Sequence, residues 1–96
     1  MFMRITWGRI ATGRWNDFET AYKEVLSREK SPVGLKHRWL VRDRNDDDAG
    51  YSVSLWETEA ALRAYAASKE RAEATARLKP YFIDEFTVTD CEVRAE

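Results

Sequence analysis

The chain has 96 residues, of which 44% are hydrophobic and 34% charged, so we expect a single folded domain spanning residues 1–96. Lys and Arg total 16 against 17 Asp and Glu, which gives a formal net charge of −1. Proteins that follow phosphate groups need an excess of basic residues, so nucleic acids and anionic membrane surfaces are excluded as expected partners.

The chain contains one cysteine, Cys91, and one histidine, His37. A lone cysteine forms neither an internal disulfide nor a cysteine-based zinc site, and a lone histidine forms no histidine cluster, so no metal site is expected. No apolar run reaches the roughly 20 residues of a membrane helix, and the first residues lack the apolar core of a signal peptide. We therefore expect a cytoplasmic protein.

The first predicted element is a strand over residues 2–10, in which bulky residues alternate with polar or small ones. Its packed face carries Met3, Ile5 and Trp7. After a turn at Gly13, apolar residues recur at helical spacing: Trp15, Phe18, Tyr22, Val25 and Leu26. This stripe predicts an amphipathic helix. Ser31-Pro32 ends it, because the residue before a proline disfavours helical geometry.

Two further strands are predicted over residues 35–42 and 51–56, joined by an acidic turn. In the first of these strands, one face carries Leu35, His37, Trp39 and Val41, and the other carries Lys36, Arg38, Leu40 and Arg42. The three aspartates of the turn, at 46–48, lack the register and closing glutamate of a calcium loop. We therefore expect a solvated hairpin turn there.

A second helical segment is predicted over residues 60–79, with Thr58 as its N-cap and Pro80 at its end. Its apolar stripe is interrupted near Ser68-Lys69, which predicts a bend or two short helices. A fourth strand is expected within residues 82–93, where Phe86 and Val88 share a face.

This order, β-α-β-β-α-β, predicts a ferredoxin-like α+β fold with an antiparallel four-stranded sheet and the helices on one face. The opposite face then has no cover from this chain. We expect it to carry Arg4, Thr6, Lys36, Arg38, Leu40 and Trp56. Because a face with Leu and Trp needs covering, the simplest partner is a second copy, which predicts a homodimer joined through its sheet faces.

Four segments carry a family resemblance: the opening strand at residues 3–10, Trp15-x-x-Phe18, Pro32-Val33-Gly34-Leu35, and residues 54–68. The last segment is similar to a family sequence of strand, Trp, acidic cap, Ala-Leu, aromatic residue and Ser. In order and spacing the chain resembles the antibiotic biosynthesis monooxygenase superfamily, whose members form dimeric α/β barrels. The resemblance covers nearly the whole chain.

The heme-degrading branch of that superfamily uses an Asn on the first strand, and a Trp and a heme-ligating His on the second helix. Aligned through Trp56, these positions are Gly8, Tyr65 and Thr75. Threonine does not replace a neutral imidazole as the axial ligand of heme. Because His37 belongs to a different element, it does not restore that ligand, and heme degradation is not expected.

Resemblance to other members implies a cofactor-independent monooxygenase that oxidises a small electron-rich aromatic substrate, such as a polyketide anthrone. In such enzymes the deprotonated substrate reacts directly with oxygen, inside an apolar pocket that holds a proton-handling group. We expect this pocket between the helices and the sheet. The catalytic candidates are Tyr65 and His37, the one side chain that titrates near neutral pH. The substrate-binding candidates are Trp7, Phe18, Tyr22, Trp39 and Trp56.

Each of these residues has a structural alternative, because rings at strand or helix spacing also serve as core packing. Arg4 and Arg38 either form structural ion pairs or bind a substrate oxyanion. The alternative function is a non-catalytic homodimeric module that binds a small hydrophobic ligand or serves as a scaffold.

Overall fold

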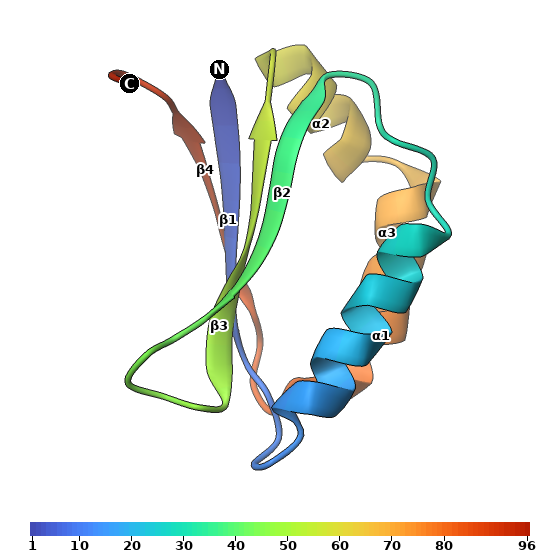
Figure 1. The fold of residues 1–96 in the computed structure, drawn as a ribbon. Helices are drawn as coiled ribbons and strands as arrows, with labels where there is room; N and C mark the ends of the chain where they lie inside the picture. Colours follow the sequence, from blue (N-terminus) through green and yellow to red (C-terminus); the bar gives the residue numbers. More distant parts are fainter.

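The chain folds into four strands, three α-helices and one short 3₁₀ turn, which the computed structural model describes over residues 1–96 (Figure 1). In chain order these are β1 (Phe2–Arg9), α1 (Trp15–Ser27), β2 (Leu35–Arg42), β3 (Ala49–Trp56), α2 (Glu59–Ala66), α3 (Lys69–Leu78), η1 (Lys79–Tyr81) and β4 (Thr87–Glu92). The strands form one antiparallel sheet in the order β2-β3-β1-β4. All three helices lie on one side of this open sheet, which confirms the predicted ferredoxin-like α+β architecture.

Helix α1 forms where the apolar spacing predicts it, and its stripe is buried at Trp15, Phe18, Tyr22 and Val25. The helix ends at Ser27, before the predicted stop at Ser31-Pro32. The turn that follows requires a glycine at Gly34, because its φ of 84° is left-handed and a side chain there would collide with Ala61.

The second helical segment is divided in two, as predicted. Thr58 caps α2 by accepting a hydrogen bond from the main-chain N–H of Ala61. The Ser68 hydroxyl donates to the carbonyl of Tyr65 at the end of α2 and accepts from the N–H of Arg71 at the start of α3. One serine therefore sets the positions of Tyr65 and Arg71 relative to each other.

The predicted faces of the sheet are reversed in the structure. The side chains that face the helices include Arg4, Thr6, Arg38, Leu40 and Trp56, which were expected on the uncovered face. Met3, Ile5 and Trp7 face the other way, because successive side chains of a strand point to opposite sides.

The reason for this reversal is space beneath the helices. A side chain at Gly8 would collide with the Phe82 ring, and one at Gly50 would collide with the Trp15 ring. Gly8 and Gly50 are directly paired across β1 and β3. The sheet therefore presents small residues where large rings enter from the helical layer, whereas apolar content alone favours the other face.

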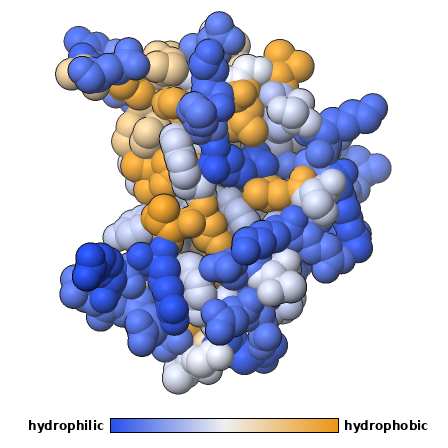
Figure 2. Space-filling view, viewed as in Figure 1, coloured by the Kyte–Doolittle hydropathy of each residue, from blue (hydrophilic) through white to orange (hydrophobic).

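The open face, defined here as the side of the sheet away from the helices, is rich in apolar residues. Trp39 and Val41 of β2 are 43% and 42% exposed. In Figure 2 apolar side chains gather over the strands on this side. The protein thus leaves an apolar sheet face without cover from its own chain, as predicted, although with different residues. None of the three helices is long and apolar enough to cross a bilayer.

Candidate active site

A cavity of about 80 Å³, partly open to solvent, lies between the sheet and helices α1 and α3. Its apolar end lies over the Gly8–Gly50 pair, where the rings of Trp15, Phe18 and Phe82 converge. Its polar end lies over the Arg4–Ser54 pair, which is in register with Arg38 of β2. The sheet register therefore gives the cavity two chemically different ends.

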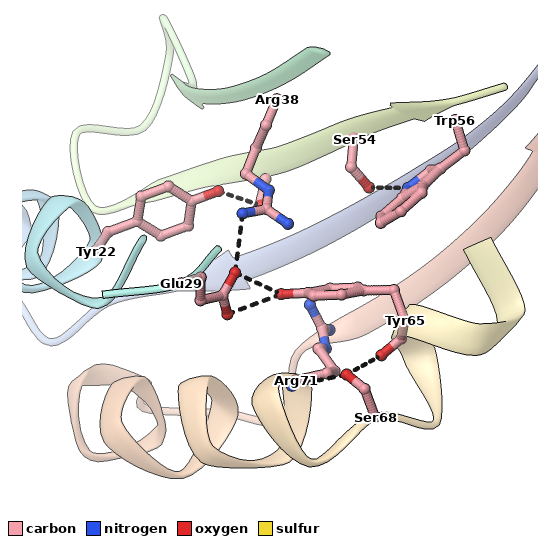
Figure 3. Close-up of polar contacts among 9 residues, drawn as sticks. Tyr22, Glu29, Arg38, Ser54, Trp56, Tyr65, Ser68 and Arg71 are labelled. Carbon is pink, nitrogen blue, oxygen red and sulfur yellow. Dashed lines mark hydrogen bonds and ion pairs between the residues drawn. The ribbon is translucent and has the colours of Figure 1, made fainter. Parts of the chain in front are cut away.

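Tyr65 lines the polar end of the cavity and binds Glu29, which does not itself line the cavity (Figure 3). The Tyr65 hydroxyl donates to the Glu29 carboxylate, with Oη to Oε1 and Oε2 distances of 3.0 and 3.2 Å. The Arg38 guanidinium pairs with the same carboxylate at 3.3 Å and lies over the Tyr65 ring, 5.2 Å from its centroid. The side chains of Arg38 and Glu29 are only 14% and 9% exposed, so this ion pair is largely shielded from water.

Two further hydrogen bonds support the site from the sheet. The Tyr22 and Ser52 hydroxyls are bonded at 2.7 Å, which ties α1 to β3. The Trp56 indole N–H donates to the Ser54 hydroxyl at 2.9 Å. The Trp56 ring packs against the Tyr65 ring, with 5.2 Å between the ring centroids. Polar residues of the sheet are therefore satisfied inside the layer between sheet and helices.

Burial raises the pKa of the Tyr65 hydroxyl; the Arg38 guanidinium opposes this rise and the Glu29 carboxylate adds to it. Burial also raises the pKa of the Tyr22 hydroxyl, against the hydrogen bond with Ser52. Both hydroxyls therefore stay protonated at neutral pH. Tyr65 can accept a proton from a bound ligand only while it passes its own proton to Glu29, which is the arrangement of a proton relay.

Three arginines line the cavity, namely Arg4, Arg38 and Arg71, and no Asp or Glu lines it. Arg4 is held by both carboxylate oxygens of Asp90, at 2.7 and 2.9 Å. These contacts raise the pKa of Arg4 and lower that of Asp90. No group of three or more His, Cys, Asp or Glu is placed to hold a metal ion.

Four of the seven predicted site residues lie in or beside the cavity. Phe18, Tyr22 and Tyr65 line the cavity. Trp56 is buried beside Tyr65 without lining the cavity.

The expectation that Trp7, His37 and Trp39 share this cavity is wrong. Trp7 lies on the open face, because it is paired in register with Tyr51 on the side of β1 opposite to Thr6 and Gly8. His37 is exposed and stacks on Trp39 at 5.3 Å, and both lie on the side of β2 opposite to Arg38. The inverted sheet accounts for all three positions.

Sequence reasoning missed Glu29 and Arg71. Glu29 lies in the turn after α1, where a single polar residue gives no signal. Arg71 does give one, because it is spaced at i, i+3 and i+7 with Ala74 and Leu78, and all three line the cavity. The positions compared with the heme-degrading branch, Gly8, Tyr65 and Thr75, also line this cavity.

Comparison with known proteins assigns the chain to a family. The family model described as antibiotic biosynthesis monooxygenase matches residues 1–77. A candidate antibiotic biosynthesis monooxygenase from Bordetella bronchiseptica is 18% identical, with a TM-score of 0.83 over 98% of this chain and 97% of that chain. A second candidate antibiotic biosynthesis monooxygenase, from Deinococcus radiodurans, is 11% identical, with a TM-score of 0.84 over 100% of this chain and 95% of that chain.

A structure from Mycobacterium tuberculosis is 10% identical, with a TM-score of 0.81 over 99% of this chain and 96% of that chain. At these identities the structural likeness shows the fold. No curated protein matches the chain. The match to the family model covers every strand and helix except the end of α3, η1 and β4, and includes Tyr65 and Arg71. The chain therefore belongs to the antibiotic biosynthesis monooxygenase family.

Proposed function

We propose that this protein is a cofactor-independent monooxygenase that oxidises a small electron-rich aromatic compound in the cavity between helices and sheet. The observation that carries the proposal is Tyr65, which lines the cavity together with the rings of Phe18 and Phe82, and whose hydroxyl is bonded to the shielded Glu29 carboxylate at 3.0 and 3.2 Å. Membership of the family supports an oxygenase reaction.

The proposed reaction starts with a proton transfer. A phenolic hydroxyl of the substrate donates to Tyr65 Oη, and as its proton moves to Tyr65, the Tyr65 proton moves to Glu29. The phenolate then reacts with O₂ at a ring carbon to form a peroxide anion, which takes the proton back through Tyr65. Loss of water from the resulting hydroperoxide leaves a carbonyl. One phenol and one O₂ thus give one quinone and one water, and the substrate supplies all four electrons.

The size of the cavity restricts the substrate. An engineered cavity of about 150 Å³ holds one benzene molecule, whereas this cavity has about 80 Å³. A single ring therefore fits only if it extends toward the open side of the cavity, and a tricyclic anthrone requires side chains to move. We accordingly place single-ring phenols ahead of polyketide anthrones as substrates.

A homodimer through the open face is part of the proposal. It is supported by the uncovered apolar residues of that face, among them Trp39 at 43% and Val41 at 42% exposure. Light scattering at micromolar concentration should give twice the chain mass. A monomer under those conditions would refute this part of the proposal and leave the reaction standing.

A second candidate function is a non-catalytic module that binds a small aromatic ligand. The position of His37 favours it, because the one imidazole of the chain is exposed outside the cavity and supplies no base there.

Oxygen uptake separates the two candidate functions. The panel contains single-ring phenols, hydroquinones and anthrones, each measured with and without protein. Protein-dependent uptake of one O₂ per quinone, with one atom of ¹⁸O₂ in the product, supports the oxygenase. Binding of these compounds without uptake supports the module.

A further inference from the structure

The charges around the cavity do not balance. Arg4, Arg38 and Arg71 all line it. Asp90 neutralises Arg4 and Glu29 neutralises Arg38. No carboxylate lies within ion-pair distance of Arg71, and no hydrogen bond leaves its guanidinium group. Three guanidinium groups against two carboxylates leave one positive charge without a partner.

The position of Arg71 directs this charge into the cavity. Arg71 lies in the first turn of α3, where its N–H donates to Ser68 Oγ at 3.1 Å. Figure 3 shows its side chain running from α3 toward the sheet, beside the Tyr65 ring. Because Ser68 also holds the carbonyl of Tyr65, at 2.6 Å, a single residue fixes the main chain of Tyr65 relative to the main chain of Arg71.

The environment of Arg71 makes its charge costly in the empty protein. Burial lowers the pKa of Arg71; Tyr65 and Tyr22 oppose this shift, and the like charges of Arg4 and Arg38 add to it. A partly buried cation without a counterion is stabilised by any anion that reaches it. The planar fork of a guanidinium group is suited to the two oxygens of a carboxylate.

We infer that the cavity binds a single-ring aromatic monoanion, whose anionic oxygen pairs with Arg71 and whose ring lies toward Phe18 and Leu40. The inference rests on the proposed function for the use of this cavity as the substrate site, and it narrows the substrate class from electron-rich aromatics to those with an oxyanion substituent. A carboxylate and a phenolate share the required chemistry.

Binding is measured by calorimetry under nitrogen, where no oxidation interferes. The ligands are benzoate, its neutral counterpart benzamide, and 4-nitrophenolate as the phenolate arm. The wild-type protein is expected to bind benzoate at least about tenfold more tightly than benzamide. Stronger binding of nitrophenolate than of benzoate would identify a phenolate as the anion. Equal binding of benzoate and benzamide by the wild-type protein would overturn the inference without the use of any variant.

Variants test the residue itself. Arg71→Gln should weaken benzoate binding about tenfold or more and leave benzamide binding unchanged, whereas Arg71→Lys should retain part of the preference. The matched control is Arg77→Gln, because Arg77 lies exposed on the same helix and outside this cavity. It should bind benzoate as the wild type does. Unchanged benzoate binding in folded Arg71→Gln, checked by circular dichroism, would also overturn the inference.

These outcomes are independent of the oxygenase proposal. If benzoate binding depends on Arg71 but no phenol is oxidised, the anion site stands and the reaction is refuted. If neutral phenols are oxidised and benzoate shows no preference over benzamide, the reaction stands and the anion site is refuted.

Discussion

The most informative test of stability concerns Glu29, which joins α1 to both β2 and α2. Its carboxylate accepts from Tyr65 and pairs with Arg38, and its side chain is only 9% exposed. Glu29→Gln keeps the shape and an acceptor oxygen but removes the charge, which leaves Arg38, with a side chain 14% exposed, without a counterion.

The expected loss follows from these contacts. Removing one partner of a buried ion pair costs about 3–5 kcal/mol. The glutamine oxygen still accepts one hydrogen bond, which offsets part of this loss. We therefore expect Glu29→Gln to lower the free energy of unfolding by about 2 kcal/mol. For a domain of this size each kcal/mol lowers the melting temperature by about 4–8 °C, so Glu29→Gln should melt roughly 8–16 °C below the wild type.

The assay is thermal and urea unfolding followed by circular dichroism, with Glu24→Gln as the matched control. Glu24 also pairs with an arginine, Arg28, but those two side chains are 60% and 54% exposed. Glu24→Gln should lower the free energy of unfolding by less than about 1 kcal/mol. If Glu29→Gln melts no lower than Glu24→Gln, the shielded ion pair contributes nothing and the reasoning is refuted.

Three further predictions concern the sheet. Gly8→Ala should destabilise the protein by about 1–3 kcal/mol, because its methyl group would collide with the Phe82 ring; an unchanged urea midpoint would show that the two layers are not closely packed there. The hydrogen bond from Arg4 lowers the pKa of Asp90, so the pair stabilises the fold above the ordinary carboxyl range and is lost as pH falls through the lowered value. Asp90→Asn should therefore reduce the loss of stability between neutral pH and about pH 2, and an unaltered acid profile would contradict the pairing. Trp39→Glu on the open face should shift the proposed dimer to monomers in sedimentation without a loss of helicity; an unaltered dimer would place the interface elsewhere.

The elements of the fold could be predicted because each has a local signal. The spacing of Trp15 and Phe18 specifies α1, and Thr58 and Ser68 are hydroxyl residues that cap the helices following them. These signals depend on neighbours in sequence, so no tertiary information is needed. No residue before Ser31 gives such a signal for the end of α1, so the sequence places that end later than Ser27, where the helix stops.

The orientation of the sheet could not be predicted from apolar content, because both faces need cover and only one meets the helices. The deciding signal is size: Gly8, Gly50, Ser52 and Ser54 all lie on the side that accepts rings from the helices. When the two faces of a strand are exchanged in a prediction, every side chain of that strand is assigned to the wrong side of the sheet. The predicted site therefore included His37, Trp7 and Trp39, which lie on the open face.

The polar end of the cavity depends on contacts between residues far apart in sequence. Tyr65 meets Glu29 from 36 positions away, and Arg4 meets Asp90 from 86. Tyr65 itself could be predicted, because its ring lies on the buried stripe of α2, but its carboxylate partner could not. What the sequence does offer is Arg71, a charged residue on the apolar stripe of α3.

The most direct measurement of the proposed function is a comparison of kcat between Tyr65→Phe and His37→Ala, using the best substrate of the phenol panel. Tyr65 lines the cavity and His37 lies on the open face. Loss of the proton relay should lower kcat by about 10²–10⁴-fold in Tyr65→Phe, whereas His37→Ala should match the wild type. Full activity in Tyr65→Phe together with inactive His37→Ala would contradict the assignment of the reaction to this cavity.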